Sequence, residues 1–151
     1  MQQSYMLDLF NSPTVVYFRT NWQNISSAAV WRIEALVNCR IVTCESWKTF
    51  SSFLENPVSL VLVDAETFDR YNITPAELAE MTSSPVGVVV DKSSYHIIPN
   101  LKNSNMQGVV PAILDVGREQ TANAISTLLN GKCHWPKKLN THTTTEIQYA
   151  R

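Results

Sequence analysis

A single carboxylate follows the most apolar stretch of this chain. The run from Ser59 to Val63 leads directly into Asp64. Such a run is typical of a strand buried on both faces of a parallel sheet. In an open α/β sheet, ligands bind at the carboxyl ends of the strands. Asp64 is therefore a candidate phosphoryl acceptor, and the residues around it must be tested for the groups that this chemistry needs.

Those groups are missing from the neighbouring strand ends. Aspartyl phosphorylation uses an acidic pair to hold Mg²⁺, and a hydroxyl and a lysine to contact the phosphoryl oxygens. The expected first strand runs into Arg19–Trp22 without an acid, and the fourth runs into Asp91 instead of a hydroxyl residue. The fifth ends in Val110-Pro-Ala112, without a lysine. We interpret Asp64 as an inactive acceptor and keep a working acceptor as an alternative.

Ion pairs are a second interpretation of these carboxylates. Arg19 and Lys92 could neutralise Asp64 and Asp91, which would fill the site without phosphate. The three histidines are scattered, and the chain contains no GxxxxGK[ST] loop, GxSxG elbow or HExxH pattern. We therefore expect no enzymatic activity, no catalytic residue, no metal site and no cofactor.

Five short apolar runs must position these groups. They are rich in β-branched residues and do not alternate with polar ones, which indicates strands covered on both faces. The runs are Thr14–Phe18, Ile41–Cys44, Val58–Val63, Val86–Val90 and Gly108–Ile113. Helices are predicted between them over residues 24–38, 46–55, 74–81, 93–103 and 115–130, with Asp115 able to cap the last one. This alternation predicts an α/β, flavodoxin-like (receiver-like) doubly wound fold with five parallel strands in the order 2-1-3-4-5.

A length of 151 residues favours one receiver-like domain, which we place over residues 1–131, followed by an extra C-terminal helix or linker over 132–151. Residues 1–130 carry twelve acidic and eight basic side chains, so this part is not a nucleic-acid binder by itself. The extra helix is expected to begin near Trp135 or Pro136.

The cysteines and the absence of targeting segments favour a reducing cytoplasm. The three cysteines lack metal-binding spacing, and the sequence shows neither a signal peptide nor an apolar span long enough to cross a bilayer.

The segment Ile125–Leu139, the strand ending in Asp64 and the strand beginning at Gly108 resemble the unorthodox receivers of LuxR-type transcription regulators. The branch with the most similar pattern contains the curli regulator CsgD and the polysaccharide regulator VpsT. There, a sixth helix leads to a C-terminal helix-turn-helix. The resemblance implies a phosphorylation-independent bacterial regulator of a biofilm or competence programme. It also implies that DNA binding belongs to a C-terminal domain absent from this chain, which we expect to be a fragment.

Some members of that branch bind cyclic di-GMP through a W-[FLM]-[ST]-R motif at the start of the sixth helix. The corresponding residues here are His134, Trp135, Pro136 and Lys137. Lysine lacks the planar fork that stacks on guanine and pairs with phosphate, and proline lacks the hydroxyl. A cyclic di-GMP sensor is therefore kept as an alternative and is not the main interpretation.

The main interpretation is a dimerisation and regulatory module. A receiver without phosphoryl chemistry can still form a two-fold homodimer through its outer helices, and this would pair two DNA-binding domains. The candidate interface residues are Ile125, Leu128, Leu129, Trp135 and Leu139. No membrane association is expected.

Overall fold

Five parallel strands form the centre of the computed structural model, which describes residues 12–136. The strands are β1 (Thr14–Phe18), β2 (Arg40–Cys44), β3 (Leu60–Asp64), β4 (Val86–Val90) and β5 (Gly108–Pro111). Their order in the sheet is β2-β1-β3-β4-β5, and each neighbouring pair is parallel. The predicted flavodoxin-like order is confirmed.

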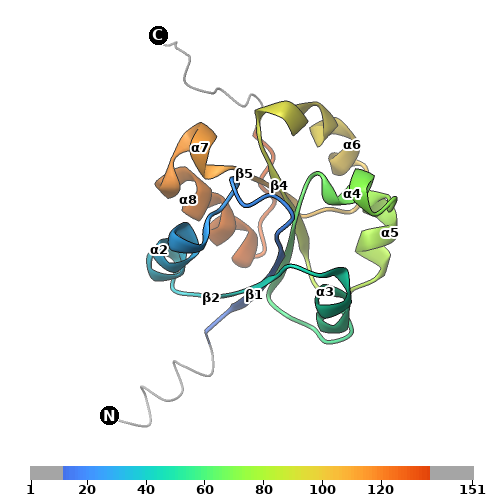
Figure 1. Ribbon diagram of the computed structural model, residues 1–151, viewed down its shortest axis with the longest axis horizontal. Coiled ribbons are helices and arrows are strands. Elements are labelled where there is room, and N and C mark those ends of the chain that lie inside the picture. Colours follow the sequence, from blue (N-terminus) through green and yellow to red (C-terminus); the bar gives the residue numbers. More distant parts are fainter. Residues whose placement is uncertain (1–11, 137–151) are drawn as a thin grey trace.

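Helices cover both faces of the sheet (Figure 1). On one face lie α2 (Ser27–Val37), α7 (Ile113–Val116) and α8 (Arg118–Leu129). On the other face lie α3 (Trp47–Phe53), α4 (Thr67–Arg70), α5 (Pro75–Glu80), the 3₁₀ helix η1 (Lys92–Ile97) and α6 (Ile98–Lys102). Among the described residues, no helix has both the length and the apolar character needed to cross a bilayer.

The alternation of side chains along β1 divides the core into two halves. Val16 and Phe18 pack on the α3 side, whereas Val15 and Tyr17 pack on the α2 side, and all four are fully buried. Because successive residues of a strand point to opposite faces, one short strand contributes to both halves of the core. Burial on both faces explains why β1, β3 and β4 read as continuous apolar runs.

Local capping explains where two of the predicted helices begin and end. The Ser26 hydroxyl accepts a hydrogen bond from Ala29 N, and Asn38 ends α2 in the left-handed conformation at φ 62°. At α5, Thr74 and Glu77 form the predicted capping box, in which each side chain binds the other residue's backbone N–H.

Two parts of the helix prediction are wrong. The expected helix over 115–130 is broken at Gly117, whose φ of 91° and ψ of 161° suit glycine alone. Asp115 therefore lies inside α7 and does not cap α8. The short helix α4, which directly follows β3, was not predicted, because the sequence leaves only a few residues between Asp64 and the capping box at Thr74.

The segment after α8 extends the sheet at its β5 edge. His134 forms an isolated parallel bridge with Gly108, and Val109 N donates to His134 O at 3.0 Å. A Cβ atom on Gly108 would lie 2.6 Å from His134 O, so only glycine permits this approach. Trp135 and Pro136 are not helical. The rest of the predicted sixth helix lies outside the described residues.

Candidate functional site

The Asp64 carboxylate is fully buried and is occupied by the protein's own donors. Its Oδ1 accepts from the Tyr17 hydroxyl at 2.5 Å and from Asn24 Nδ2 at 3.0 Å. Its Oδ2 accepts from Thr20 N at 2.7 Å and from Asn21 N at 2.8 Å. With 0% exposure, neither oxygen is free to attack a phosphoryl donor in this conformation.

The fold explains how these donors converge. Tyr17 is paired in register with Leu62, and Asp64 lies two residues further along β3, so both polar side chains point to the α2 face. The loop from β1 to α2 then folds back over the carboxylate and presents two backbone N–H groups. Sequence analysis missed Tyr17 and Asn24. Tyr17 could have been found from the sequence, because it is a tyrosine within an apolar strand and a buried tyrosine hydroxyl needs a hydrogen-bond partner.

Burial raises the pKa of the Asp64 carboxyl above its ordinary value, because the charged form loses its hydration. The hydrogen bonds from Tyr17, Asn24, Asn21 and Thr20 lower the pKa and oppose this effect. Burial and the neighbouring Asp64 carboxylate also raise the pKa of Tyr17 well above its ordinary value. At neutral pH Tyr17 therefore remains a protonated donor.

Arg19 does not pair with Asp64, so that part of the ion-pair interpretation is wrong. Its Nη2 lies 2.7 Å from Glu45 Oε2, and its Nη1 donates to Ile25 O at 3.2 Å. The guanidinium also lies 3.8 Å from the ring centre of Trp22, a cation–π contact. Arg19 is 4% exposed. It holds the β1–α2 loop in place and does not neutralise Asp64.

Asp91 likewise does not pair with Lys92 as expected but bonds to two serines. Its Oδ1 accepts from Ser93 Oγ and from Ser94 N and Oγ at 2.7–3.2 Å, which caps η1. The described residues contain no ion pair between Asp91 and Lys92. They also contain no group of three His, Cys, Asp or Glu side chains that could hold a metal ion.

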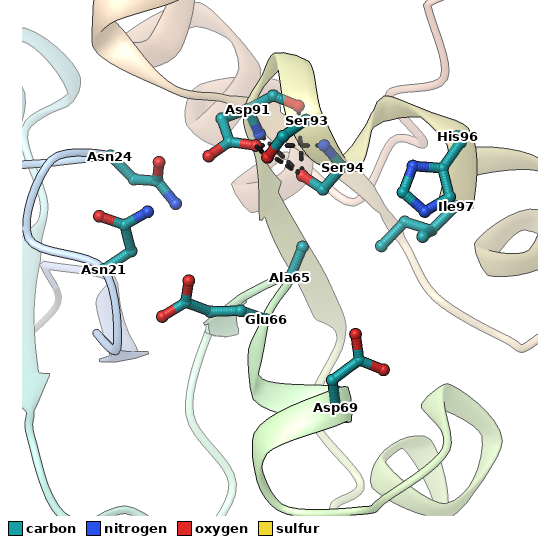
Figure 2. A pocket seen from close by; sticks show the side chains of 10 residues that line it. All are labelled: Asn21, Asn24, Ala65, Glu66, Asp69, Asp91, Ser93, Ser94, His96 and Ile97. Carbon is teal, nitrogen blue, oxygen red and sulfur yellow. Dashed lines mark hydrogen bonds between the residues drawn. The ribbon is translucent and has the colours of Figure 1, made fainter.

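A polar pocket lies beside Asp64 at the carboxyl edge of the sheet. The segments that follow β1, β3 and β4 contribute Asn21 and Asn24, Glu66 and Asp69, and Asp91 and Ser93, respectively (Figure 2). Strand order reverses between β1 and β3, and this is where ligands bind in open α/β sheets. Asp64 itself does not line the pocket, because the β1–α2 loop covers it.

The residues at the cyclic di-GMP motif positions are packed against the domain. The His134 Nδ1 atom lies 2.9 Å from Val109 O, and the half-buried Trp135 packs against the core on the α6 side. Pro136 is the last described residue. Lys137 lies outside the described residues, so its position in the motif stays a prediction.

The predicted interface residues fall into different environments. Ile125 and Leu128 are fully buried between α8 and the sheet, so they are not available to a partner, and that part of the prediction is corrected. Leu129 and Trp135 are partly buried. Leu139 lies outside the described residues. The large exposed apolar side chains that the described residues place on this face are instead Trp31 and Leu36 of α2, with 79% and 55% exposure, and Leu114 of α7, with 76%.

Solved structures with a similar fold include two response regulators and one regulatory domain. A LuxR family DNA-binding response regulator from Silicibacter pomeroyi is 19% identical, with a TM-score of 0.64, and the match covers 83% of this chain and 98% of that one. A response regulator from Hahella chejuensis is 11% identical, with a TM-score of 0.57 and coverages of 79% and 93%. The regulatory domain of the master biofilm regulator CsgD is 14% identical, with a TM-score of 0.52 and coverages of 83% and 93%.

These likenesses show that the chain has the receiver fold. No protein-family model matches the chain, and the search of curated proteins gives no relative.

Proposed function

We propose that this chain is the receiver-like regulatory domain of a LuxR-type transcription regulator and that it acts without aspartyl phosphorylation. The supporting observation is the occupied carboxylate: Asp64 receives four hydrogen bonds and is fully buried. A phosphoryl acceptor must expose a carboxylate oxygen in line with the donor phosphorus. Here the β1–α2 loop would first have to open, and both of its backbone N–H groups would lose their acceptor.

The electrostatics of the site support the same proposal. Transfer to a carboxylate adds negative charge, which receivers offset with Mg²⁺ and a lysine. In this chain the cation at the end of β1, Arg19, is already engaged by Glu45. The end of β5 provides Pro111 and Ala112. An acyl phosphate on Asp64 would therefore remain poorly stabilised.

Intact-mass spectrometry tests this proposal. The protein is incubated with acetyl phosphate and Mg²⁺, beside an ordinary receiver that carries the full set of phosphorylation residues. We expect the control to gain one phosphoryl group and this chain to gain none. A gain that disappears in Asp64→Asn would overturn the proposal and establish the phospho-acceptor alternative.

The module is proposed to work as a homodimer. On the α2–α8 face, Trp31 and Leu36 project from α2, and a second copy that covered them would remove apolar surface from water. Light scattering over a range of concentrations should give a dimer that Trp31→Glu weakens. Met81→Glu is the control, because Met81 is also exposed, at 40%, but lies at the end of α5 on the opposite face of the sheet. A monomer at all concentrations would contradict the proposal.

DNA binding and any cyclic di-GMP response complete the proposal. DNA contact belongs to a C-terminal domain. By analogy with the LuxR-type regulators that the chain resembles, the regulated programme would be biofilm formation or competence. For cyclic di-GMP, calorimetry at micromolar ligand is expected to give no heat, because Trp135 is packed against the core. A saturable signal that is lost in Trp135→Ala would instead support the sensor alternative.

A further inference from the structure

The polar pocket at the carboxyl edge remains open although Asp64 is covered. It has a volume of about 170 Å³ and adjoins a second pocket of about 250 Å³, which is bounded by Leu114 and Asp115 of α7. Asn24, Asp91 and Ser93 line both pockets. The two pockets thus form one groove across the ends of β1, β3, β4 and β5, with these three residues where the pockets meet.

Asn24 presents a fixed acceptor to this groove. This residue is 5% exposed, and its Nδ2 donates to Asp64 Oδ1. Because a carboxylate can only accept, the amide cannot turn over without losing this bond. The amide oxygen, Oδ1, therefore remains an unused acceptor, and none of the described residues donates a hydrogen bond to it. Figure 2 shows the amide pointing into the pocket.

Asp91 presents a second acceptor. Its Oδ1 takes all the hydrogen bonds from Ser93 and Ser94. Its Oδ2 receives none from the described part of the chain. Figure 2 shows that this free oxygen points toward the side of the pocket from which Asn24 projects. A ligand between the two residues would therefore have to be a hydrogen-bond donor.

The charges around the groove have a negative balance. The first pocket is lined by three acidic residues, Glu66, Asp69 and Asp91, and by His96. The second pocket shares Asp91 and adds Lys92 and Asp115. Arg70 engages Glu66 at 3.0 Å, which leaves Asp69 and Asp91 without a basic partner among the described residues. The field in the pocket therefore favours a cation.

We propose that this groove binds an organic cation, whose guanidinium or ammonium group donates hydrogen bonds to Asn24 Oδ1 and Asp91 Oδ2. The described residues place no three acidic, histidine or cysteine side chains together as a metal site. A group that carries several N–H donors matches separate acceptors better than a compact divalent ion does. This inference goes beyond the proposed function, because it gives the domain a ligand at the edge where phosphate would act in an ordinary receiver.

Amide NMR of the full 151-residue chain tests the proposal, with agmatine as the probe. Agmatine carries both a guanidinium and an ammonium group and no acid. We expect saturable shifts in the amides of residues 20–24, 65–69 and 91–94. Butylamine, which has only the ammonium group, should cause shifts at the same residues but bind more weakly. The absence of shifts with agmatine up to millimolar concentration would overturn the proposal.

Two matched variants make the test specific. Asp91→Asn retains a side-chain oxygen that can cap η1 but removes the charge that faces the groove. It should weaken agmatine binding about tenfold, since hydrogen bonds to charged groups are the stronger ones. Glu80→Gln removes the same charge from an exposed position on α5 and should leave binding unchanged. Equal losses in both variants, or displacement of agmatine by Mg²⁺ from the same residues, would overturn the proposal.

Discussion

The Tyr17 hydroxyl lies 2.5 Å from Asp64 Oδ1, and both side chains are fully buried on the α2 face of the sheet. Tyr17 of the inner strand β1 and the Asn24 amide thus occupy one oxygen of the carboxylate, while two backbone N–H groups of the loop that follows β1 occupy the other. The carboxylate that looks like an acceptor in the sequence is a structural anchor for the β1–α2 loop. Its energetic role can be measured.

Removing this acceptor should destabilise the domain strongly. In Asp64→Ala, two backbone N–H groups, the Tyr17 hydroxyl and the Asn24 amide lose their partner. Each unsatisfied buried group costs about 1–3 kcal/mol. Thr20 and Asn21 are only half-buried, so most of the loss comes from the Tyr17 hydroxyl and the Asn24 amide, and we expect a loss of about 3–5 kcal/mol in the free energy of unfolding. Urea denaturation followed by circular dichroism measures this loss.

Asp64→Asn is the matched control for the alanine variant. Its oxygen can still accept from Thr20 N and Asn21 N. Its NH₂ group can donate to the Tyr17 hydroxyl and to an Asn24 amide that has turned over. We expect a change of about 1 kcal/mol or less. Equal stability of the Asn and Ala variants would show that the four hydrogen bonds do not anchor the loop.

The stability of the protein should depend on pH through Asp64. Burial raises the pKa of its carboxyl in the folded state above the ordinary 3.8. Between the ordinary pKa of the unfolded state and the higher pKa of the folded state, the folded protein binds more protons than the unfolded protein. The free energy of unfolding therefore falls as pH rises through this window. Relative to Asp64→Asn, which cannot titrate, the wild type should lose stability from about pH 4 upward and level off above the folded pKa.

Tyr17→Phe provides a second measurement of the same effect. The Tyr17 hydrogen bond lowers the pKa of Asp64, so its removal should raise that pKa further and extend the window to higher pH. Denaturation curves at a series of pH values measure both effects. Parallel curves for the wild type and Asp64→Asn would contradict the assignment.

The sequence predicted the strands well because their signal is local. Val86–Val90 and Leu60–Asp64 are buried on both faces, and this requirement appears directly as continuous apolar residues. The break at Gly117 was not predictable in the same way. Only Gly117 lies between α7 and α8 in the sequence, and only the backbone conformation at that glycine separates the two helices.

The site was harder to predict than the fold. The absence of phosphorylation residues could be read from strand ends such as Arg19 and Pro111, because parallel strands bring their carboxyl ends to one edge. The partners of Asp64 depend instead on how the β1–α2 loop folds back, and loop conformation has no periodic signal. For the same reason, Arg19 was assigned to Asp64, although it pairs with Glu45.

Thiol labelling should distinguish the three cysteines. Burial raises the pKa of the Cys39 thiol to about 11 and also raises the pKa of Cys44, whereas Cys133 is exposed. Because the thiolate is the reactive form, iodoacetamide at mildly alkaline pH should add one group to the native protein and three to the denatured protein. Cys133→Ser should abolish the native adduct. Early labelling of Cys39 would contradict the packing of α2 against β2.

The attachment of the 132–136 segment to β5 should depend on Gly108. In Gly108→Ala the new Cβ would lie 2.6 Å from His134 O and 2.7 Å from His134 N. Both are backbone atoms that cannot rotate away. The segment must therefore move, and Val109 N loses its acceptor, the carbonyl of His134. We expect faster hydrogen exchange at Val109, faster tryptic cleavage after Lys132, and a stability loss of about 1–3 kcal/mol.

Gly87→Ala separates this effect from crowding in the core. A Cβ on Gly87 would meet the Leu128 and Leu62 side chains at 2.8 Å and 3.0 Å, and the third nearest atom would be Gly108 O at 3.5 Å, not an atom of His134. It should cost a similar amount of stability, because side chains must repack, yet leave cleavage after Lys132 unchanged under native conditions. If both variants accelerated that cleavage equally, the segment would be released by general destabilisation. The close backbone approach at Gly108 would then not be what holds the C-terminal segment on the sheet.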